Sequence, residues 1–359
     1  MPSKKTIEVL RVLAHNYYIG EIIGKGGYGR VYAAVRRSDC VPVAIKIIKK
    51  YKMDPFCDEA MEVCLMRRVC HVPGVIQLLD DYYINNVLVI VMERMENSMD
   101  LVQFSNTDEF TPLLAQKFFH ELVEILIQCL ASGVIHHDVK PENILVDRQN
   151  QTIKLIDFGC GTYHRSFYTQ FRGTGDYLPP EYYRNKVYHG EPATVWSLGV
   201  LLFNIMYRHM PFDFMYQSLA DPIITEYDIN FWEDNSVPPQ CRALLQDILV
   251  FDANKRISLK GILSHPAVSS PWFDLSDMEE VEELIDLPII VFDNYEVDDL
   301  FGDCQMLMVE DLGYHRCPTD ATSIPQNFDF GRLTTTSSTI DARNQIGNCI
   351  DFLDIDCGT

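Results

Sequence analysis

Two acids, an amide and a lysine lie close together in the sequence and suit the binding of a metal and a phosphate. Asp138, Lys140 and Asn143 fall within residues 136–143, and Asp157 follows nineteen residues after Asp138, in an Asp-Phe-Gly triplet. Carboxylate and amide oxygens suit Mg²⁺, which prefers oxygen ligands and nucleotide phosphates over an all-protein cage. Each fragment alone could be a polar loop, but the four residues in this order are not a coincidence.

A glycine cluster near the N-terminus is a second candidate for phosphate binding. Gly24 to Val31 match the pattern G-x-G-x-x-G-x-V. Glycines in a hairpin let the backbone approach phosphate oxygens without side-chain collision. Glycines also mark tight turns in general, so the pattern alone is equally that of a Gly-rich turn. A dinucleotide-binding fingerprint would continue into a helix, whereas residues 30–35 have the composition of a strand.

Lys46 lies within an apolar strand pattern, Val-Ala-Ile-Lys. A lysine there is costly to bury unless it meets an anion, and either a phosphate or a carboxylate would serve. Glu62, sixteen positions later in a predicted helix, can supply the carboxylate. Glu59 lies one turn earlier on the same face, so spacing alone leaves the choice open. The alternative is a surface lysine whose stem covers apolar neighbours.

The elements that must position these residues change in type along the chain. Strands are predicted over 18–23, 30–35, 41–48, 75–79 and 87–92, with one helix over 58–69. Helices are predicted over 113–132, 195–206 and 241–251. A β-rich part followed by an α-rich part is the α+β arrangement.

Composition and charge narrow the class of protein. The 359 residues are 47% apolar and carry a formal net charge of −21, which allows a sizeable core and excludes a wholly disordered protein. Nucleic acid and anionic membranes are disfavoured partners, because both need clustered lysine and arginine. The length suggests about two domains or one large two-lobed domain.

The charge is concentrated at the C-terminal end. Residues 271–359 contain 20 acids and 3 bases, against 31 acids and 27 bases in residues 1–270. Apolar runs such as Leu287 to Phe292 sit among acidic residues there, which predicts a largely disordered segment with short apolar motifs. This acidic tail could bind basic residues of a partner, pack apolar pieces on the preceding domain, or only add solubility.

The cysteines and the N-terminus favour a reducing compartment, the cytosol or the nucleus. Eleven cysteines occur without a C-x-x-C pair or zinc-like spacing, so we expect free thiols. Residues 1–20 lack the apolar core of a signal peptide. The longest apolar stretch, 195–207, is too short to span a bilayer.

Together these motifs resemble the eukaryotic protein kinase family: a Gly-rich loop, V-A-I-K, H-x-D-x-K-x-x-N, D-F-G and an A-P-E-like Pro179-Pro180-Glu181. The resemblance covers residues 18–266. Within the family it is strongest to the Pim-type serine/threonine kinases, through residues 61–63, 93–94, 155–159, 188–190 and 195–199.

The resemblance implies a bilobal fold. It places a short extension over 1–16 and a kinase domain over 17–270, followed by the acidic tail over 271–359. Within the domain it implies a β-rich N-lobe over about 17–92, a hinge over about 93–96 and a helical C-lobe over about 97–270.

The resemblance also implies roles for the candidate residues. Asp138 would be the catalytic base and Lys140 would contact the transferred phosphate. Lys46, paired with Glu62, would bind the α- and β-phosphates of ATP. Asn143 and Asp157 would hold Mg²⁺. Met92 matches the gatekeeper. The implied ATP-binding residues are Ile23, Gly24, Lys25, Gly26, Gly27, Tyr28, Gly29, Val31, Ala44, Lys46, Glu93, Met95, Leu145 and Ile156.

Four residues bear on the substrate. Lys140 followed by Thr174 resembles serine/threonine kinases more than tyrosine kinases. Glu142 and Asp100 match acids that read arginine on substrates of basophilic kinases, through bidentate contacts. The alternative is that both are solvated surface acids. We therefore expect protein substrates with basic residues near serine or threonine, no nucleic-acid or membrane partner, and a monomer.

Several residues depart from common kinase patterns. His137 replaces the arginine that commonly grips a phosphorylated activation loop, so we predict activity without that phosphorylation. Thr194 replaces an Asp that Pim-type kinases also lack. Met95 replaces a hinge proline of Pim-type kinases and restores a backbone N–H there. Cys160, after the Asp-Phe-Gly triplet, is expected to be a buried inert thiol rather than a reactive one.

An active serine/threonine kinase using Mg-ATP is the leading hypothesis. A pseudokinase scaffold is the alternative from another class, but such proteins usually lose residues equivalent to Lys46, Asp138 or Asp157. A metabolic small-molecule kinase is disfavoured by the complete activation segment, 157–181.

Overall fold

The computed structural model describes residues 3–26, 29–211, 237–269 and 271–272. By its internal contacts the chain divides into residues 1–317 and 318–359, and every described residue belongs to the first unit. Gly27 and Tyr28, at the tip of the glycine loop, lie outside the described residues, as does the acidic tail beyond Trp272.

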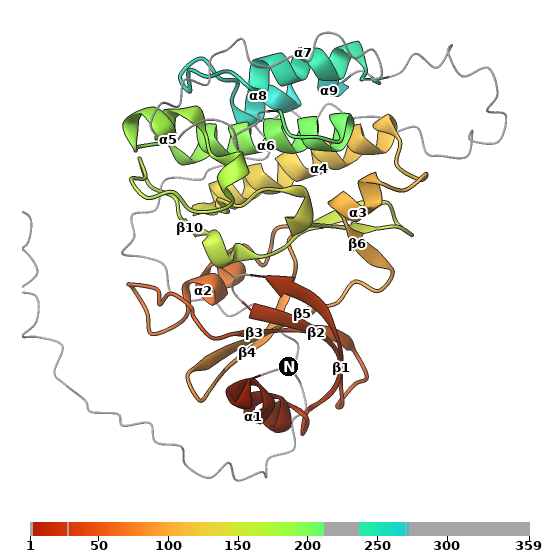
Figure 1. Ribbon diagram of the computed structural model, residues 1–359, viewed down its shortest axis with the longest axis vertical. Coiled ribbons are helices and arrows are strands. Elements are labelled where there is room, and N and C mark those ends of the chain that lie inside the picture. Colours follow the sequence, from red (N-terminus) through yellow and green to blue (C-terminus); the bar gives the residue numbers. More distant parts are fainter. Residues whose placement is uncertain (1–2, 27–28, 212–236, 270, 273–359) are drawn as a thin grey trace, which may run out of the picture. The chain divides into compact units, whose positions relative to one another are not determined.

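The first part of the chain forms a five-stranded antiparallel sheet, with helix α2 (Met61–Arg68) beside it, as Figure 1 shows. The strand order is β1-β2-β3-β5-β4. The strands are β1 (Tyr17–Gly26), β2 (Gly29–Arg36), β3 (Pro42–Ile48), β4 (Leu78–Ile84) and β5 (Val87–Glu93). Strands β3 and β5 are rich in β-branched residues and are buried almost throughout, as expected for strands covered on both faces.

Side chains of β3 alternate between two clusters. Val43, Ile45 and Ile47 belong to a cluster on the outer face of the sheet, whereas Ala44 and Ile48 belong to the main core. Lys46 shares the inner face with Ala44 and Ile48, because successive strand residues point to opposite faces. The strand therefore presents its lysine to the side on which the second part of the chain lies.

An N-terminal helix, α1 (Lys4–Leu13), covers the outer face. Ser3 caps it by accepting a hydrogen bond from the backbone N–H of Thr6. Val9 and Leu13 are buried in the outer cluster. The sequence analysis assigned residues 1–16 only as an extension, and the structure adds that most of this extension is helical and packed.

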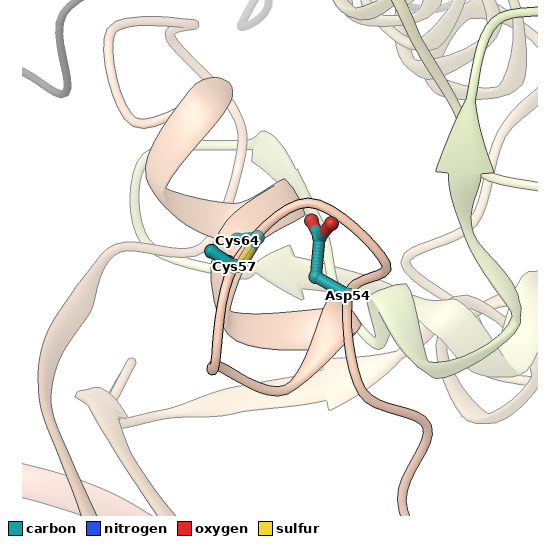
Figure 2. A group of neighbouring side chains, drawn as sticks. All are labelled: Asp54, Cys57 and Cys64. Atoms are coloured by element: carbon teal, nitrogen blue, oxygen red, sulfur yellow. The ribbon is translucent and has the colours of Figure 1, made fainter. Parts of the chain in front are cut away.

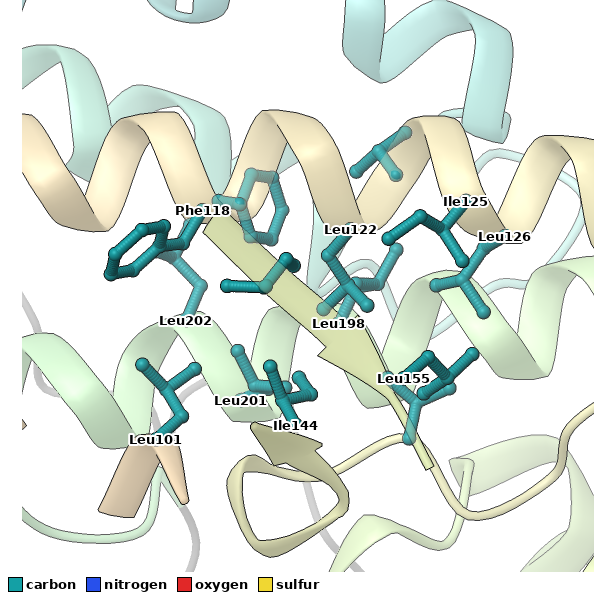
Figure 3. Close-up of a cluster of buried hydrophobic side chains, with 14 of the residues drawn as sticks. Leu101, Phe118, Leu122, Ile125, Leu126, Ile144, Leu155, Leu198, Leu201 and Leu202 are labelled. Carbon is teal, nitrogen blue, oxygen red and sulfur yellow. The ribbon is translucent and has the colours of Figure 1, made fainter. Parts of the chain in front are cut away.

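The second part of the chain is mainly helical. Its central helices are α4 (Pro112–Ala131) and α6 (Gly190–Tyr207), and they contact each other. Figure 3 shows their shared core, in which Leu122 and Leu126 of α4 lie near Leu198 of α6. Smaller helices are α3 (Leu101–Ser105), α5 (Pro180–Asn185), α7 (Pro239–Ile248), α8 (Leu259–Leu263) and α9 (Pro266–Ser269). The α+β bilobal kinase fold expected from the sequence is confirmed.

Short strands flank the loops that carry the polar residues. They are β6 (Ser98–Asp100), β7 (Val134–Ile135), β8 (Ile144–Asp147), β9 (Thr152–Leu155) and β10 (Thr162–Tyr163). Three 3-10 turns lie between or after them: η1 (Pro141–Asn143), η2 (Phe158–Cys160) and η3 (Gly175–Tyr177). Among the helices of the described residues, none is long and apolar enough to cross a membrane.

Four predicted elements are shifted in the structure. The helix expected over 195–206 is α6, which begins five residues earlier, at Gly190. The strand expected over 75–79 is β4, which spans 78–84. The apolar run overlaps only its start, because this half-exposed edge strand carries Asp80 and Asp81. The helix expected over 58–69 starts at Met61, because Met53 and Ala60 form a β-bridge that keeps residues 54–59 in a loop. The helix expected over 241–251 spans 239–248.

The chain is still packed two residues beyond 270, the predicted end of the domain. Trp272 is 2% exposed and belongs to the main core. Its backbone N–H donates to Oε1 of Gln116 at 3.2 Å, and its indole Nε1–H donates to the Ala267 carbonyl at 2.6 Å. These contacts join Trp272 to α4 and α9.

Candidate active site

Lys46 contacts acidic side chains from both parts of the chain. Its Nζ lies 2.6 Å from Oε1 of Glu62 on α2 and 2.8 Å from Oδ1 of Asp157, which directly precedes η2. The lysine side chain is 7% exposed. Two carboxylates therefore provide the anionic partners that a buried ammonium requires.

The structure pairs Lys46 with Glu62 and not with Glu59. Glu59 lies in the loop before α2, and its carboxylate contacts the guanidinium of Arg67. The loop explains the difference, because Glu59 is not part of the helix and does not share a helical face with Glu62.

Charges in this group stabilise one another. Burial raises the pKa of Glu62, and the nearby charge of Asp157 adds to this effect, although Lys46 opposes it. Burial would also raise the pKa of Asp157, but the Lys46 ammonium and the Gly159 N–H outweigh it, so the pKa of Asp157 is lowered. Asp157 has φ of 64°, a left-handed conformation in which its carboxylate accepts from the N–H of Gly159. The carboxylate is therefore kept ionised.

Asp138 lies at the centre of a second polar group. Its Oδ1 accepts hydrogen bonds from the Thr174 hydroxyl at 2.8 Å and from the Thr174 backbone N–H at 2.9 Å. Its Oδ2 accepts from Nδ2 of Asn143 at 3.0 Å and lies 3.2 Å from Nζ of Lys140. Lys140 also donates to the Thr174 hydroxyl at 2.7 Å. Asp138, Lys140 and Asn143 of the predicted motif thus form one hydrogen-bonded group with Thr174, which lies more than thirty residues later in the chain.

Gly173 lets the activation segment approach the catalytic loop. Its φ is +103°, and a Cβ there would lie 2.3 Å from the carbonyl oxygen of His137. A side chain at this position would therefore push Thr174 away from Asp138.

His136 holds the loop that carries Asp138 in place through both of its ring nitrogens. Its Nε2 donates to the Ile156 carbonyl at 2.9 Å, and its Nδ1 accepts from the Asp138 N–H at 3.3 Å. These two bonds require the neutral Nε2–H tautomer, in agreement with a pKa that burial lowers. The ring also packs edge-on against Phe158, at 4.9 Å between centroids. The sequence analysis did not assign His136 a role, and its buried position was the missing signal.

Comparison with known proteins gives this arrangement a family. The protein kinase domain model matches residues 17–268. The chain belongs to the protein kinase family. Its kinase domain is 35% identical over 264 residues to the serine/threonine-protein kinase prk-2 of Caenorhabditis elegans, covering 70% of this chain and 58% of that protein. It is 34% identical over 285 residues to the serine/threonine-protein kinase pim-2 of Danio rerio, covering 75% and 89%.

More distant relatives are also protein kinases. A probable serine/threonine-protein kinase, MARK-A of Dictyostelium discoideum, is 32% identical over 263 residues, which is 71% of this chain and 24% of that protein. The higher identity to the pim-2 protein confirms a kinase that is Pim-like at moderate identity. This chain spans less than two thirds of the length of the nematode relative.

The kinase's expected adenine site is formed by side chains of both lobes. Ala44 of β3 pairs with Met92 of β5, and both are nearly buried in the main core. Val31 of β2 and Ile156 pack against the same core, and Ile23 is 48% exposed at the sheet edge. Leu145 on β8 is half-buried. The structure thus leaves the predicted adenine-contacting side chains partly accessible.

The glycine loop of the kinase is a β1–β2 hairpin. Gly24 pairs with Val31, Lys25 with Arg30, and Gly26 with Gly29. A Cβ on Gly29 would lie 2.2 Å from the carbonyl oxygen of Ile47, so this glycine is needed for close approach of β2 to β3. At Gly26 a Cβ would meet no atom within 4 Å.

Hinge residues are tied to their surroundings by side chains. The Glu93 carboxylate accepts from the Gln77 N–H at 2.8 Å and contacts Lys154. The Met95 carbonyl accepts from the Ser98 hydroxyl at 2.8 Å. The predicted hinge is therefore anchored on both sides of Arg94.

The residues present fit Mg²⁺ and a nucleotide. Asn143 uses its amide nitrogen for Asp138, donating also to the Asp138 carbonyl at 2.7 Å, so its side-chain oxygen is the atom that can face a cation. Asp157 is kept ionised and supplies carboxylate oxygens. An oxygen-only donor set of this kind suits Mg²⁺ with phosphate as a further ligand.

His137 occupies an aromatic environment. Its ring lies edge-on to Tyr168 at 4.7 Å and to Tyr188 at 5.9 Å, and its Nε2 is 2.8 Å from the hydroxyl of Thr162. Desolvation, with further contributions from Arg172, His136 and Lys52, lowers its pKa to about 3. The sequence did not identify this cage, because Tyr168 and Tyr188 are distant in the chain.

Glu142 and Asp100 lie on elements that contact each other, η1 and β6. Glu142 is exposed. Asp100 caps α3 by accepting from the Gln103 N–H at 2.8 Å, so it has a structural role that the sequence analysis did not foresee. A cap uses one carboxylate oxygen and leaves the second for another partner.

The structure buries Cys160, as predicted, and it also buries Arg256. Cys160 is 5% exposed, as expected of an inert thiol. The side chain of Arg256 is fully buried, and its guanidinium donates two hydrogen bonds to the Glu181 carboxylate, of 3.1 and 2.9 Å. Thr194 donates to the Gly190 carbonyl within its own helix, at 2.8 Å.

Proposed function

We propose that this protein is an active serine/threonine protein kinase that transfers the γ-phosphate of ATP to serine and threonine hydroxyls of protein substrates. The observation that carries the proposal is the Asp138–Lys140–Thr174 group beside an intact Lys46–Glu62–Asp157 contact. A pseudokinase scaffold would not need both groups complete.

Each residue has a defined task in phosphoryl transfer. Asp138 accepts the proton of the substrate hydroxyl, and Lys140 stabilises charge on the transferred phosphate. Lys46, oriented by Glu62, binds the nucleotide phosphates. Mg²⁺, held by Asn143 and Asp157, would neutralise negative charge on these phosphates. The reaction is thus promoted by positioning and charge stabilisation.

Substrates with basic residues near the acceptor are favoured. The exposed Glu142 and the second oxygen of Asp100 lie on neighbouring elements and suit a guanidinium partner. Replacing Asp100 by Ser keeps a capping oxygen but removes the charge, which separates the two roles of this residue.

We therefore expect Asp100→Ser to raise the Michaelis constant for an arginine-containing peptide about tenfold, as for loss of one charged hydrogen bond. The same variant should act normally on a peptide whose arginine is replaced by alanine. Equal Michaelis constants of wild type and variant for the arginine peptide would contradict the role of Asp100.

Activation-loop phosphorylation is not required in this proposal. The neutral ring of His137 cannot bind a phosphate as an arginine does. The Thr162 hydroxyl and two tyrosines already hold this ring in place. Phosphatase-treated protein should therefore stay active. Inactivity until Thr162, Ser166 or Thr169 is phosphorylated would overturn this part.

The proposed setting is the cytosol or nucleus, as a monomer without nucleic-acid partners. The excess of acids disfavours nucleic-acid partners, and six described cysteines are free, which supports a reducing setting. Cys70 is disulfide-bonded, against the expectation that all of the thiols are free.

Transfer of radiolabelled phosphate to a basic serine/threonine peptide tests the main proposal. Asp138→Asn should lower kcat by about 100-fold or more, because it removes the proton acceptor but preserves shape. Equal labelling by wild type and variant would defeat the kinase assignment and favour the scaffold.

A further inference from the structure

A group of potential metal ligands lies outside the active site, between β3 and α2. It consists of Asp54 and Cys57, in the loop before α2, and Cys64 on α2. One ligand atom from each lies within 4.8 Å of the others. The two sulfur atoms are 3.2 Å apart. Figure 2 shows the two cysteine side chains side by side, with Asp54 next to them.

The loop that carries the first two residues is closed by backbone contacts. Met53 and Ala60 form an antiparallel bridge. The Asp54 N–H donates to the Glu59 carbonyl at 2.8 Å, and the Met61 N–H donates to the Lys52 carbonyl, also at 2.8 Å. The closed loop turns Cys57 back onto Cys64, so the ligand atoms converge without an ion.

Asp54 is oriented by two further contacts. Its Oδ1 accepts from the Phe56 N–H at 2.8 Å, and its Oδ2 accepts from the hydroxyl of Tyr163 on β10. Asp54 is 4% exposed and Cys64 is 7% exposed. A hydrogen-bond donor behind a ligating carboxylate is a common feature of metal sites, because it fixes the ligand's orientation.

We propose that Asp54, Cys57 and Cys64 bind a structural Zn²⁺ ion. Two thiolates and one carboxylate form a donor set that favours zinc over Mg²⁺ or Ca²⁺, which take oxygen ligands. Binding replaces the two thiol protons, which pass to solvent. The fourth position is filled by water or by Glu59, whose Oε2 is 3.7 Å from the Cys64 sulfur.

The distance between the two sulfur atoms needs only a small adjustment. Ligands at about 2.0–2.3 Å from zinc lie roughly 3.5–3.8 Å apart in a tetrahedron. The sulfur separation of 3.2 Å must therefore widen by about half an ångström. This is within reach of side-chain rotation at Cys57, which lies in the loop and is half-buried.

An ion here would join three elements. Cys64 lies two residues after Glu62 on α2, and Asp54 is hydrogen-bonded to Tyr163 in the activation segment. Zinc would thereby hold the start of α2 against the loop and β10, with Glu62 directed at Lys46. The site would stabilise the arrangement of α2 seen in the structure.

Metal binding by the full-length protein tests this proposal. After chelator treatment under reducing conditions, the protein is titrated with zinc chloride and, separately, with cobalt chloride. We expect tight binding of about one equivalent at this site, a rise in Tm, and a thiolate-to-cobalt charge-transfer band. The double variant Cys57→Ser, Cys64→Ser should lose this equivalent and the band.

Matched variants locate the ion. Cys40→Ser, at an exposed cysteine elsewhere in the same lobe, should bind like wild type. Tyr163→Phe should weaken zinc binding about tenfold, because it removes only the hydrogen bond to the Asp54 carboxylate. If the double variant does not fold, Cys57→Ser and Asp54→Asn, both in the loop, provide the same comparison.

Three results would overturn the proposal. The first is that reduced wild-type protein binds no zinc above the level of free thiols. The second is that the cysteine variants bind as much zinc as wild type, which would assign the ion to other cysteines. The third is peptide mapping that finds a Cys57–Cys64 disulfide under the same reducing conditions.

Discussion

Lys46 shows how a single residue can connect two lobes. Its ammonium contacts Glu62 from α2 and Asp157 from the C-lobe, so the position of each carboxylate depends on the same buried charge. If one carboxylate is removed, Lys46 keeps its ion pair with the other. The variant should therefore still fold, but the Lys46 ammonium should shift.

We expect Glu62→Gln to lower kcat/KM by about 100-fold, because a misplacement of about 1 Å can have that effect. Glu59→Gln is the matched control on the same segment. It breaks a half-exposed contact with Arg67 and should change kcat/KM by less than about fivefold. Steady-state kinetics with a basic peptide measures both, and equal losses would show that pairing with Lys46 is not what matters.

His137 gives a residue-scale prediction for stability against pH. Its pKa is about 3 in the folded protein and about 6.5 when unfolded. The unfolded state therefore binds more protons between these values. The stabilisation is complete above about pH 6.5 and is lost progressively as pH falls toward 3.

When the pH falls from 7.5 to 5, the titration of His137 should lower the unfolding free energy of the wild-type protein by about 2 kcal/mol. His137→Gln should lack this part of the acid sensitivity, since Gln does not titrate. Urea unfolding of both proteins at the two pH values measures the difference. An identical loss in the variant would mean that other groups account for it.

At the scale of elements, α1 is a stabilising cover rather than part of the catalytic apparatus. Leu13 contacts the outer face of the sheet through the cluster that includes Val43, Ile45 and Ile47. Lys46 lies on the other face of the same strand. Substitutions in α1 should therefore change the stability of the protein but not its catalytic activity.

Leu13→Ala should lower the unfolding free energy by about 2–5 kcal/mol, the usual range for a large-to-small change in a core. Val12→Ala, one residue away and 51% exposed, should change it by less than about 0.5 kcal/mol. Thermal unfolding compares them, and kcat measured well below Tm should be the same for both. A large effect of Val12→Ala would indicate that α1 packs through another face.

At the scale of the whole molecule, the charge is unevenly distributed along the sequence. Most of the net charge of −21 belongs to residues 271–359, and exposed charges act over only about 8 Å at physiological salt. The proposed recognition of basic substrates is therefore attributed to Glu142 and Asp100 rather than to bulk charge. The charge boundary near 270 also proves to be a poor guide to packing, since Trp272 is buried.

A chain ending at residue 270 should be less stable than one ending at residue 274. The difference should be about 3–5 kcal/mol, as for loss of a buried tryptophan, because the contacts of Trp272 with Gln116 and Ala267 disappear. Thermal unfolding of the two truncated chains measures it. Equal Tm values would show that Trp272 contributes little to the domain.

The sequence by itself determined the fold family, the order of the lobes and the residues of the polar groups. These features depend on local patterns, such as strand alternation, glycine spacing and short polar motifs, which are readable within a few residues. The choice between Glu59 and Glu62, the packing of α1 and the cage around His137 were decided only by the tertiary structure. So was the convergence of Asp54, Cys57 and Cys64, which lack a zinc-like spacing. Each of these depends on which distant side chains share a buried space, and close packing fixes that only when the whole chain is folded.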